Sequence, residues 1–192
     1  DEQAADEVER IGIGRSWGAI EGADVVLFLH DLTRTGDAAY DAAETEIRAR
    51  LQANRLKMVL HNLPGGDWAA GDRGIAANPA RVDEFRAGVA KAISYATTLG
   101  VPQLNCLAGK APEGVSDAVI RQTFVDNVRF AAKALKESGL KLLLEPINNY
   151  DVPGFWLNRT DLAISVIEEV GADNVFVQYD IYHAQRYEGE LA

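Results

Sequence analysis

Residues 140–151 read LKLLLEPINNYD, an aliphatic run that ends on a carboxylate and a proline. The apolar run from Leu142 to Leu144 has the composition of a buried strand, yet a carboxylate, Glu145, follows it directly. Pro146 has no amide hydrogen to give to a sheet, so the strand is predicted to end here with Glu145 at its rim. A buried carboxylate without a partner is costly, so a divalent cation or a basic group is expected beside Glu145.

Other short apolar runs have the same strand-like character. They are VVLFLHD (25–31), KMVLHN (57–62), PQLNCLAG (102–109) and VFVQYDIYH (175–183), beside KLLLEPIN (141–148). Helical patterns lie between the runs, at 38–53, 80–99, 117–138 and 160–170, with another at 5–22. This alternation predicts an α/β fold of helices and five parallel strands, which form one domain over residues 1–192.

The composition narrows the possible classes of protein. Hydrophobic residues make up 47% and charged residues 25% of the 192 residues, which is typical of a globular protein. The net charge of −10 argues against a surface that binds nucleic acid. The single cysteine, Cys106, excludes an internal disulfide and favours a reducing cytoplasm. No apolar stretch is long enough to span a membrane, so we expect no membrane partner. The acidic residues 1–9 lack the basic and apolar regions of a signal peptide, so none is expected.

Polar residues at the ends of the predicted strands are the candidates for a site, because ligands of parallel α/β folds bind beyond the carboxyl ends of the strands. The candidates are His30, Asp31, His61, Asn62, Asn105, Cys106, Glu145, Asn148, Asp180 and His183. A strand-end Asp or Asn can equally cap the next helix, and a lone histidine can be purely structural. We favour this structural interpretation for His30 and Asp31, whereas the spacing of Asp180 and His183 leaves a metal site and a structural role equally open.

The longest irregular segment, residues 64–79, contains several glycines and Trp68. Loops of this length in α/β domains often act as lids or contact substrate, and we favour that interpretation over a plain connection.

From about residue 47 to 192 the chain resembles the hydroxypyruvate isomerases, which belong to the xylose isomerase-like TIM barrels. The matching stretches are KMVLHNLPGGDWAAGDRGIA, PQLNCLAGKAP, LLLEPINNYDVPGFWLN and VQYDIYHAQRYEGEL. The resemblance implies the isomerisation of a small substrate, hydroxypyruvate, to tartronate semialdehyde. It also implies a divalent metal, with Mg²⁺ or Mn²⁺ preferred, although the site could also lack a bound ion.

The resemblance assigns roles to particular residues. Glu145 is implied as a metal ligand and as one of two acid–base glutamates, and Asp180 as a second metal ligand. Asp151, His183 and Arg186 are implied to contact the substrate, and the strand-end residues His61 and Asn105 are included as substrate-binding candidates. The family continues beyond the EGEL segment with βα units that supply the other catalytic glutamate. Loss of this glutamate from the sequence is therefore expected to impair turnover.

Residues 1–46 resemble a different protein. DEVERIGIGRSWGAIEGADVVLFLHD is similar to part of the G domain of the bacterial tRNA-modifying GTPases of the TrmE type, although no phosphate-binding loop is present. We interpret the chain as a chimera of a GTPase-like segment, 1–46, and an isomerase-like segment, 47–192. A non-catalytic engineered chimera is therefore the alternative to an active isomerase.

Five strands are fewer than the eight of a (β/α)₈ barrel. We expect either a partial TIM barrel or an open parallel sheet. Because an incomplete barrel exposes sheet edges, self-association is also expected.

Overall fold

The computed structural model of the protein describes residues 45–46, 49 and 51–189. By their contacts, the residues form two compact units, Asp1–Phe28 with Arg34–Val59, and Leu29–Thr33 with Leu60–Ala192. In the first unit the described residues 45–46, 49 and 51–53 are helical, in agreement with the helix predicted at 38–53.

Several predictions fall outside the described residues. They concern the helix at 5–22, the strand at 25–31 with His30 and Asp31, and nearly all of the GTPase-like segment 1–46. The organisation of the chain as one domain also stays a prediction.

The second unit is built around a parallel sheet, which confirms the predicted α/β class. Its strands are β1 (His61–Asn62), β2 (Gln103–Cys106), β3 (Lys141–Leu144) and β4 (Val175–Val177). They lie in the order β1-β2-β3-β4, and each neighbouring pair is parallel. The strands correspond to the predicted runs, although the ladder of β1 is limited to two residues.

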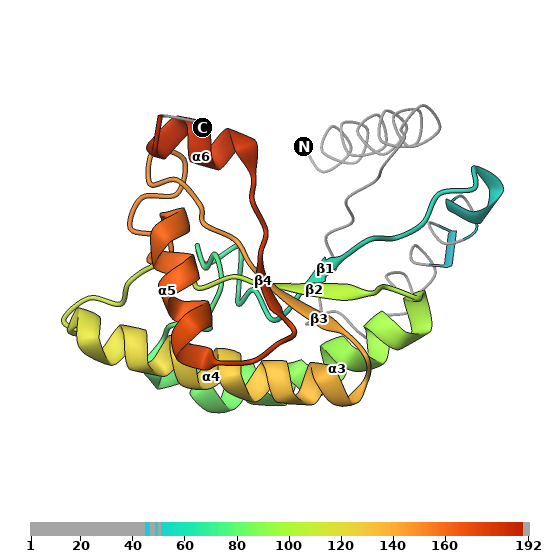
Figure 1. Ribbon diagram of the computed structural model, residues 1–192, viewed down its shortest axis with the longest axis horizontal. Coiled ribbons are helices and arrows are strands. Elements are labelled where there is room, and N and C mark those ends of the chain that lie inside the picture. The colour runs from blue at the N-terminus through green and yellow to red at the C-terminus, as the bar shows by residue number, and fades with distance from the viewer. Residues whose placement is uncertain (1–44, 47–48, 50, 190–192) are drawn as a thin grey trace, which may run out of the picture. The chain divides into compact units, whose positions relative to one another are not determined.

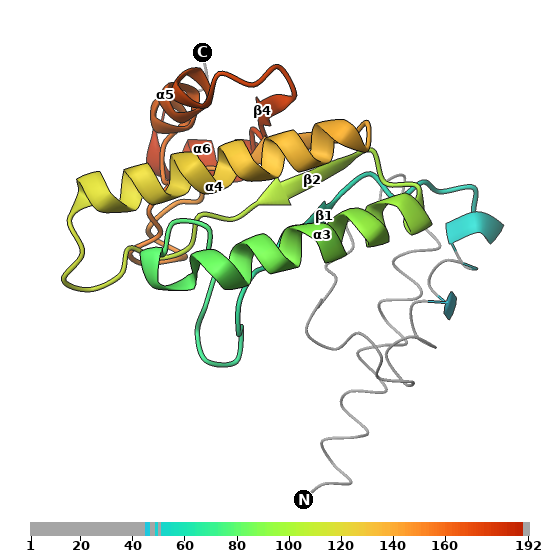
Figure 2. The same ribbon diagram turned by 90° about the horizontal axis from the view of Figure 1, so that it is seen from below.

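Long helices follow the strands and cover one face of the sheet. They are α3 (Val82–Leu99), α4 (Asp117–Glu137) and α5 (Thr160–Val170), with the short 3-10 helix η2 (Pro79–Arg81) before α3. Two views show α3 and α4 side by side along the sheet (Figures 1 and 2). Helix α3 ends at Gly100 and α5 at Gly171, both with a left-handed backbone that glycine adopts without strain.

The core lies between the helices and the sheet. Leu104, Leu142 and Leu144 are fully buried and lie on the helix-covered face, since alternate residues of a strand point to opposite faces. Phe85 of α3 and Phe124 of α4 are also fully buried. The apolar runs of the sequence therefore form strands because the helices remove one of their faces from water.

The opposite face of the sheet carries polar groups. The register aligns Asn62 with Asn105, Asn105 with Leu143, and Leu143 with Phe176, so these four residues form one row. Glu145 lies two residues beyond Leu143 and so belongs to this same face.

The strand predicted at 175–183 is too long. Strand β4 ends at Val177, and residues 181–187 form a short helix, α6 (Ile181–Tyr187). The helix begins here because the Asp180 side chain accepts hydrogen bonds from the amides of Tyr182 and His183. Asp180 therefore caps α6, which is one of the two roles that the sequence left open for it.

The loops that follow β1, β2 and β3 are joined by backbone contacts. Isolated bridges pair Gly74 with Ala108, and Lys110 with Phe155. The predicted lid, residues 64–79, is further held by the ion pair between Asp72 and Arg81. This segment is thus anchored at several points, and its function as a lid stays a prediction. Among the described residues, no helix has both the length and the apolar character needed to cross a membrane.

Candidate functional site

Glu145 lies at the centre of the polar face. Its carboxylate is largely buried and accepts a hydrogen bond of 2.7 Å from the Asn105 side-chain amide. Burial raises the pKa of Glu145, and the neighbouring charge of Asp180 acts in the same direction. Hydrogen bonds from Asn105 and Gln178, and the proximity of His183, oppose this rise in pKa without cancelling it. The side chain therefore resists ionisation more than an exposed glutamate does.

Glu145, Asp180 and His183 form a group that could hold a metal ion. Each of the three residues offers one ligand atom, and these three atoms lie within 4.8 Å of one another. Two carboxylates and an imidazole are ligand types that suit a divalent cation. The buried amide oxygens Asn105 Oδ1 and Gln178 Oε1 lack a hydrogen-bond partner, as expected where a further polar group binds. The donor set and the unpaired oxygens both fit the metal expected from the sequence.

The two oxygens of Asp180 have different surroundings. Oδ1 accepts hydrogen bonds from the backbone amides of Tyr182, at 2.8 Å, and His183, at 3.4 Å. Oδ2 lies 4.0 Å from His183 Nε2. Oδ1 of Asp180 therefore caps helix α6, while Oδ2 remains available to bind a ligand together with Glu145 and His183.

Asn148 joins the loop after β3 to helix α6. Its side chain is fully buried, and its Nδ2 lies 2.8 Å from Asp151 Oδ2 and 2.7 Å from His183 Nδ1. Its Oδ1 accepts hydrogen bonds from the backbone amides of Tyr150 and Asp151. From the sequence, Asn148 is predicted only as a strand-end residue, although the run Asn-Asn-Tyr-Asp is typical of a side-chain-stabilised turn.

Asp151 and Arg186 lie at the exposed rim of this group. Hydrogen bonds from Asn148 and from the Tyr182 hydroxyl, the latter at 2.7 Å, lower the pKa of Asp151, and the charge of Arg186 adds to the effect. Arg186 Nη2 lies 3.6 Å from Asp151 Oδ1, and its guanidinium lies over the Tyr150 ring. An anionic substrate group at this rim would meet a cation that is only loosely paired.

The structure does not bring His61 to this group. The register pairs His61 with Leu104, which places it on the helix-covered face, opposite to Asn105. Its pKa is lowered by burial, and hydrogen bonds with the backbone at Asn62 and at Ala92 of α3 oppose this effect. Consecutive residues of a strand point to opposite faces of the sheet, so Asn62, the neighbour of His61, lies on the polar face.

Two further residues of the site, Gln178 and Tyr182, were not among the residues predicted from the sequence. Gln178 directly follows β4, and its amide donates to the carbonyl of Leu144, so it lies level with Glu145 across the sheet. Only the strand register reveals this, since the sequence places the two residues far apart. Cys106 is buried on the helix side, where burial raises its thiol pKa, and it does not belong to the site.

The chain matches a known family over most of its length. The family described as xylose isomerase-like TIM barrel matches residues 18–192. Hydroxypyruvate isomerase of Escherichia coli is 53% identical over 152 residues, which cover 79% of this chain and 59% of the relative. A 2-oxo-tetronate isomerase of Cupriavidus necator is 44% identical over 153 residues, which cover 80% of this chain and 59% of the relative. The chain thus spans about three fifths of the length of these relatives.

A solved structure extends the comparison to the fold. The crystal structure of an AP endonuclease of family 2 from Brucella melitensis superposes with a TM-score of 0.79 and 36% identity, and covers 92% of this chain and 66% of that one. The match to the TIM-barrel family begins at residue 18 and so includes much of the segment 1–46. The comparisons give no support to the predicted GTPase-like origin of that segment.

Proposed function

The chain belongs to the xylose isomerase-like TIM-barrel family, and on that premise we propose that its site isomerises a small 2-oxo-3-hydroxy acid. Hydroxypyruvate, which would become tartronate semialdehyde, is the first candidate because the relative that shares 53% identity is a hydroxypyruvate isomerase. The observation that carries the proposal is the group of Glu145, Asp180 and His183, gathered at the carboxyl ends of β3 and β4.

The reaction moves a proton from the hydroxyl-bearing carbon to the neighbouring carbonyl carbon. We propose Glu145 as one of the groups that carry this proton. In the metal-free site, burial raises the pKa of Glu145, which brings its carboxyl group nearer to the range in which an acid–base catalyst both accepts and returns a proton. Asn105 and Gln178, which hydrogen-bond to the carboxylate, keep it fixed in position.

Other residues would bind and orient the substrate. Arg186 is proposed to attract the substrate carboxylate, and Asp151 to accept a hydrogen bond from a substrate hydroxyl. His183 is proposed to contact a substrate oxygen. Glu145 and Asp180 would hold a divalent ion, Mg²⁺ or Mn²⁺, which when bound offsets the negative charge that develops on the substrate oxygens.

A second substrate is favoured by a specific relative. The 2-oxo-tetronate isomerase that is 44% identical to this chain acts, by its name, on an acid with one more carbon than hydroxypyruvate. Both compounds have a carbonyl beside the carboxylate and a hydroxyl on the next carbon, so the same proton transfer serves either one. The alternative to an active isomerase remains a non-catalytic engineered chimera.

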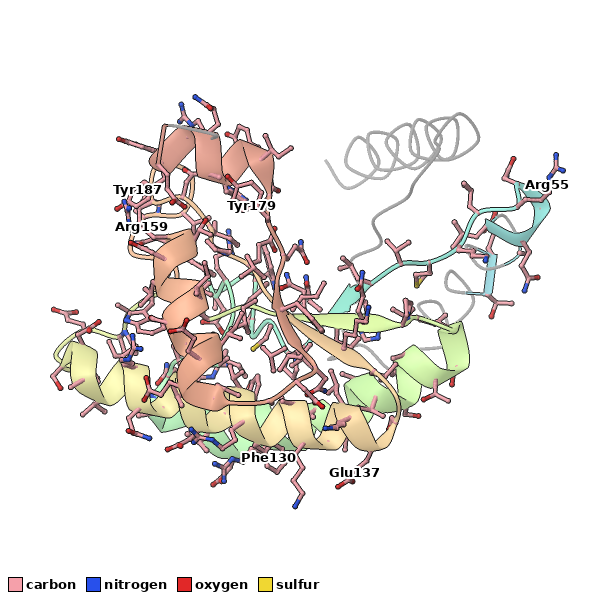
Figure 3. The ribbon with its side chains drawn as sticks, in the orientation of Figure 1. Arg55, Phe130, Glu137, Arg159, Tyr179 and Tyr187 are labelled. Atoms are coloured by element: carbon pink, nitrogen blue, oxygen red, sulfur yellow. The ribbon has the colours of Figure 1, made fainter. Side chains whose placement is uncertain are left out.

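The test compares turnover of both substrates by the protein, by Glu145→Gln and by Glu137→Gln, with Mn²⁺ and with a chelator. Glu137 is exposed at the end of α4, on the side of the unit away from α6 (Figure 3), and serves as the matched control. We expect Glu145→Gln to lower kcat by about 10²-fold or more and Glu137→Gln to have no effect. A folded, metal-loaded protein that turns over neither substrate would favour the non-catalytic chimera.

We also propose that copies of the chain associate through β4 and the residues beside it. Among the described residues, β4 pairs with β3 alone, and Phe176, Ile181 and Tyr182 next to this edge are exposed. A sheet edge flanked by apolar side chains is a ready template for pairing with another copy.

A further inference from the structure

Asn148 uses all of the hydrogen-bonding capacity of its side chain. Oδ1 accepts from the backbone amides of Tyr150, at 3.0 Å, and Asp151, at 2.9 Å. Nδ2 has two hydrogens and two neighbours, Asp151 Oδ2 at 2.8 Å and His183 Nδ1 at 2.7 Å. The residue is fully buried, so water does not compete for these positions.

The chemistry of the neighbours fixes which end of the amide is oxygen. Backbone amides can only donate, so they require the oxygen of Asn148 on their side. The ionised carboxylate of Asp151 can only accept, so it requires the nitrogen. Reversing the amide would set donor against donor and acceptor against acceptor in a buried place, at a cost of about 1–3 kcal/mol for each unpaired group.

The orientation of Asn148 in turn decides where His183 carries its hydrogen. Because Nδ2 of Asn148 can only donate, Nδ1 of His183 must accept. The hydrogen of the neutral imidazole is therefore on Nε2. Nε2 is the ring nitrogen that lies 4.0 Å from Asp180 Oδ2, so it is the one on the side of the Glu145 group.

We propose that Asn148 is a positioning residue that holds His183 in the Nε2–H tautomer, so that His183 presents a hydrogen-bond donor to the site and is not a metal ligand. The ion is then left to Glu145 and Asp180 within the group that the geometry brings together. The partner of the Nε2–H is an oxygen of the ligand: a carbonyl, hydroxyl or carboxylate oxygen of the substrate. Only this last step rests on the proposed function.

The tautomer can be measured directly in the unmodified protein. Two-bond ¹H–¹⁵N correlations of the imidazole rings, recorded without metal at about pH 8, distinguish a protonated from an unprotonated nitrogen at each ring position. The chain contains three histidines, and the signals of His183 are those that disappear in His183→Gln. We expect Nε2 of His183 to be protonated and Nδ1 to be unprotonated. A protonated Nδ1 would overturn the proposal.

The variant Asn148→Asp tests whether Asn148 sets the tautomer. The introduced carboxylate can only accept from His183, so the hydrogen is expected to move to Nδ1. The matched control is Gln185→Glu, which adds the same charge at an exposed position of α6, two residues from His183. We expect the control to keep the Nε2–H pattern. An Asn148→Asp protein with a native amide spectrum and an unchanged His183 pattern would show that Asn148 does not set the tautomer.

Activity gives an independent readout. Asn148→Asp is expected to lower kcat/KM at least about tenfold, because His183 would lose the Nε2–H that donates to the substrate oxygen, while Gln185→Glu retains it. If the unmodified protein has no turnover, the proposed function fails, whereas the tautomer is still decided by the spectra.

Discussion

At the level of single residues, Glu145 is held where its charge is disfavoured. The amides of Asn105 and Gln178 partly offset the loss of water around its carboxylate, but the negative charge of Asp180 lies close by. A strand that ended in an apolar residue would avoid this cost. The arrangement is typical of functional positions, where stability is lower than the fold alone would allow.

The raised pKa of Glu145 predicts that Glu145→Gln stabilises the metal-free protein. Between the unfolded and the folded pKa, the folded state binds more protons than the unfolded state, so stability falls as the pH rises through that window. At neutral pH the neutral glutamine removes this cost. We expect a gain of about 1 kcal/mol, or a few °C in Tm, that disappears near about pH 3, where the glutamate is protonated in both states.

Thermal unfolding followed by circular dichroism, in chelator and at several pH values, measures this difference. Glu137→Gln, the exposed control, should leave Tm unchanged at every pH. A lower Tm for Glu145→Gln at neutral pH would mean that the charged form is the better-stabilised one, contrary to the raised pKa.

Single residues also show how far the sequence could predict the site. Glu145 could be found from the sequence because a carboxylate after three leucines needs compensation wherever it lies. His61 could not be placed, since its face depends on a register that is set by pairing with β2. Asn148 was named as a strand-end group, but its contact with His183 joins two elements that only the fold brings together.

At the level of secondary-structure elements, strong periodicity made the helices predictable, and α5 begins and ends where it was expected. The last run was misassigned because its β-rich composition continues beyond the point where Asp180 caps a helix. Local hydrogen bonding thus prevailed over strand propensity at that point. The turn into α6 also brings Asp180 and His183 close to Glu145.

Substitution can separate the capping role of Asp180 from its proposed role as a metal ligand. Asp180→Asn keeps an oxygen that can cap α6 and removes the charge, so we expect nearly unchanged stability and Mn²⁺ affinity reduced at least about tenfold. Asp180→Ala removes both functions and should in addition cost about 1 kcal/mol of unfolding free energy. Urea unfolding and calorimetric titration with Mn²⁺ measure the two effects. Equal destabilisation by both variants would contradict capping through Oδ1.

The contact between the loops after β1 and β2 depends on the absence of a side chain at Gly74. A Cβ there would lie 2.4 Å from the carbonyl oxygen of Leu107, and the backbone has a φ of +117°. Gly71 also has a positive φ, +97°, but a Cβ there meets no atom within 4 Å. The pair of substitutions therefore separates backbone strain from the close approach of the two loops.

We expect Gly71→Ala to cost about 1 kcal/mol, from the strained backbone alone. Gly74→Ala should cost about 3 kcal/mol, because the bridge to Ala108 must also open. The free energies of unfolding in urea provide the comparison. Similar losses for the two variants would mean that the loops separate without consequence for stability.

At the level of the whole molecule, the exposed apolar side chains are unevenly distributed. Nine large hydrophobic residues are exposed among those that the structure describes, and four of them lie within residues 176–182. Tyr179 is one of them, in the segment that leads from β4 to α6 (Figure 3). The same segment follows the strand that pairs with β3 alone in the described sheet. Within the described part of the chain, an edge without a further strand thus coincides with apolar side chains, which favours a second copy as its partner.

We therefore expect the protein to form dimers at micromolar concentrations and Ile181→Lys to weaken them, because a buried lysine at the contact would lose its hydration. Ile181 is 62% exposed, and Ile164 on α5, at 46%, offers the matched control Ile164→Lys, which should leave association unchanged. Light scattering across a range of concentrations measures the mass of each variant. A protein that is monomeric at every concentration would contradict the proposal that a second copy pairs with β4. Equal weakening of association by both variants would place the contact on another surface.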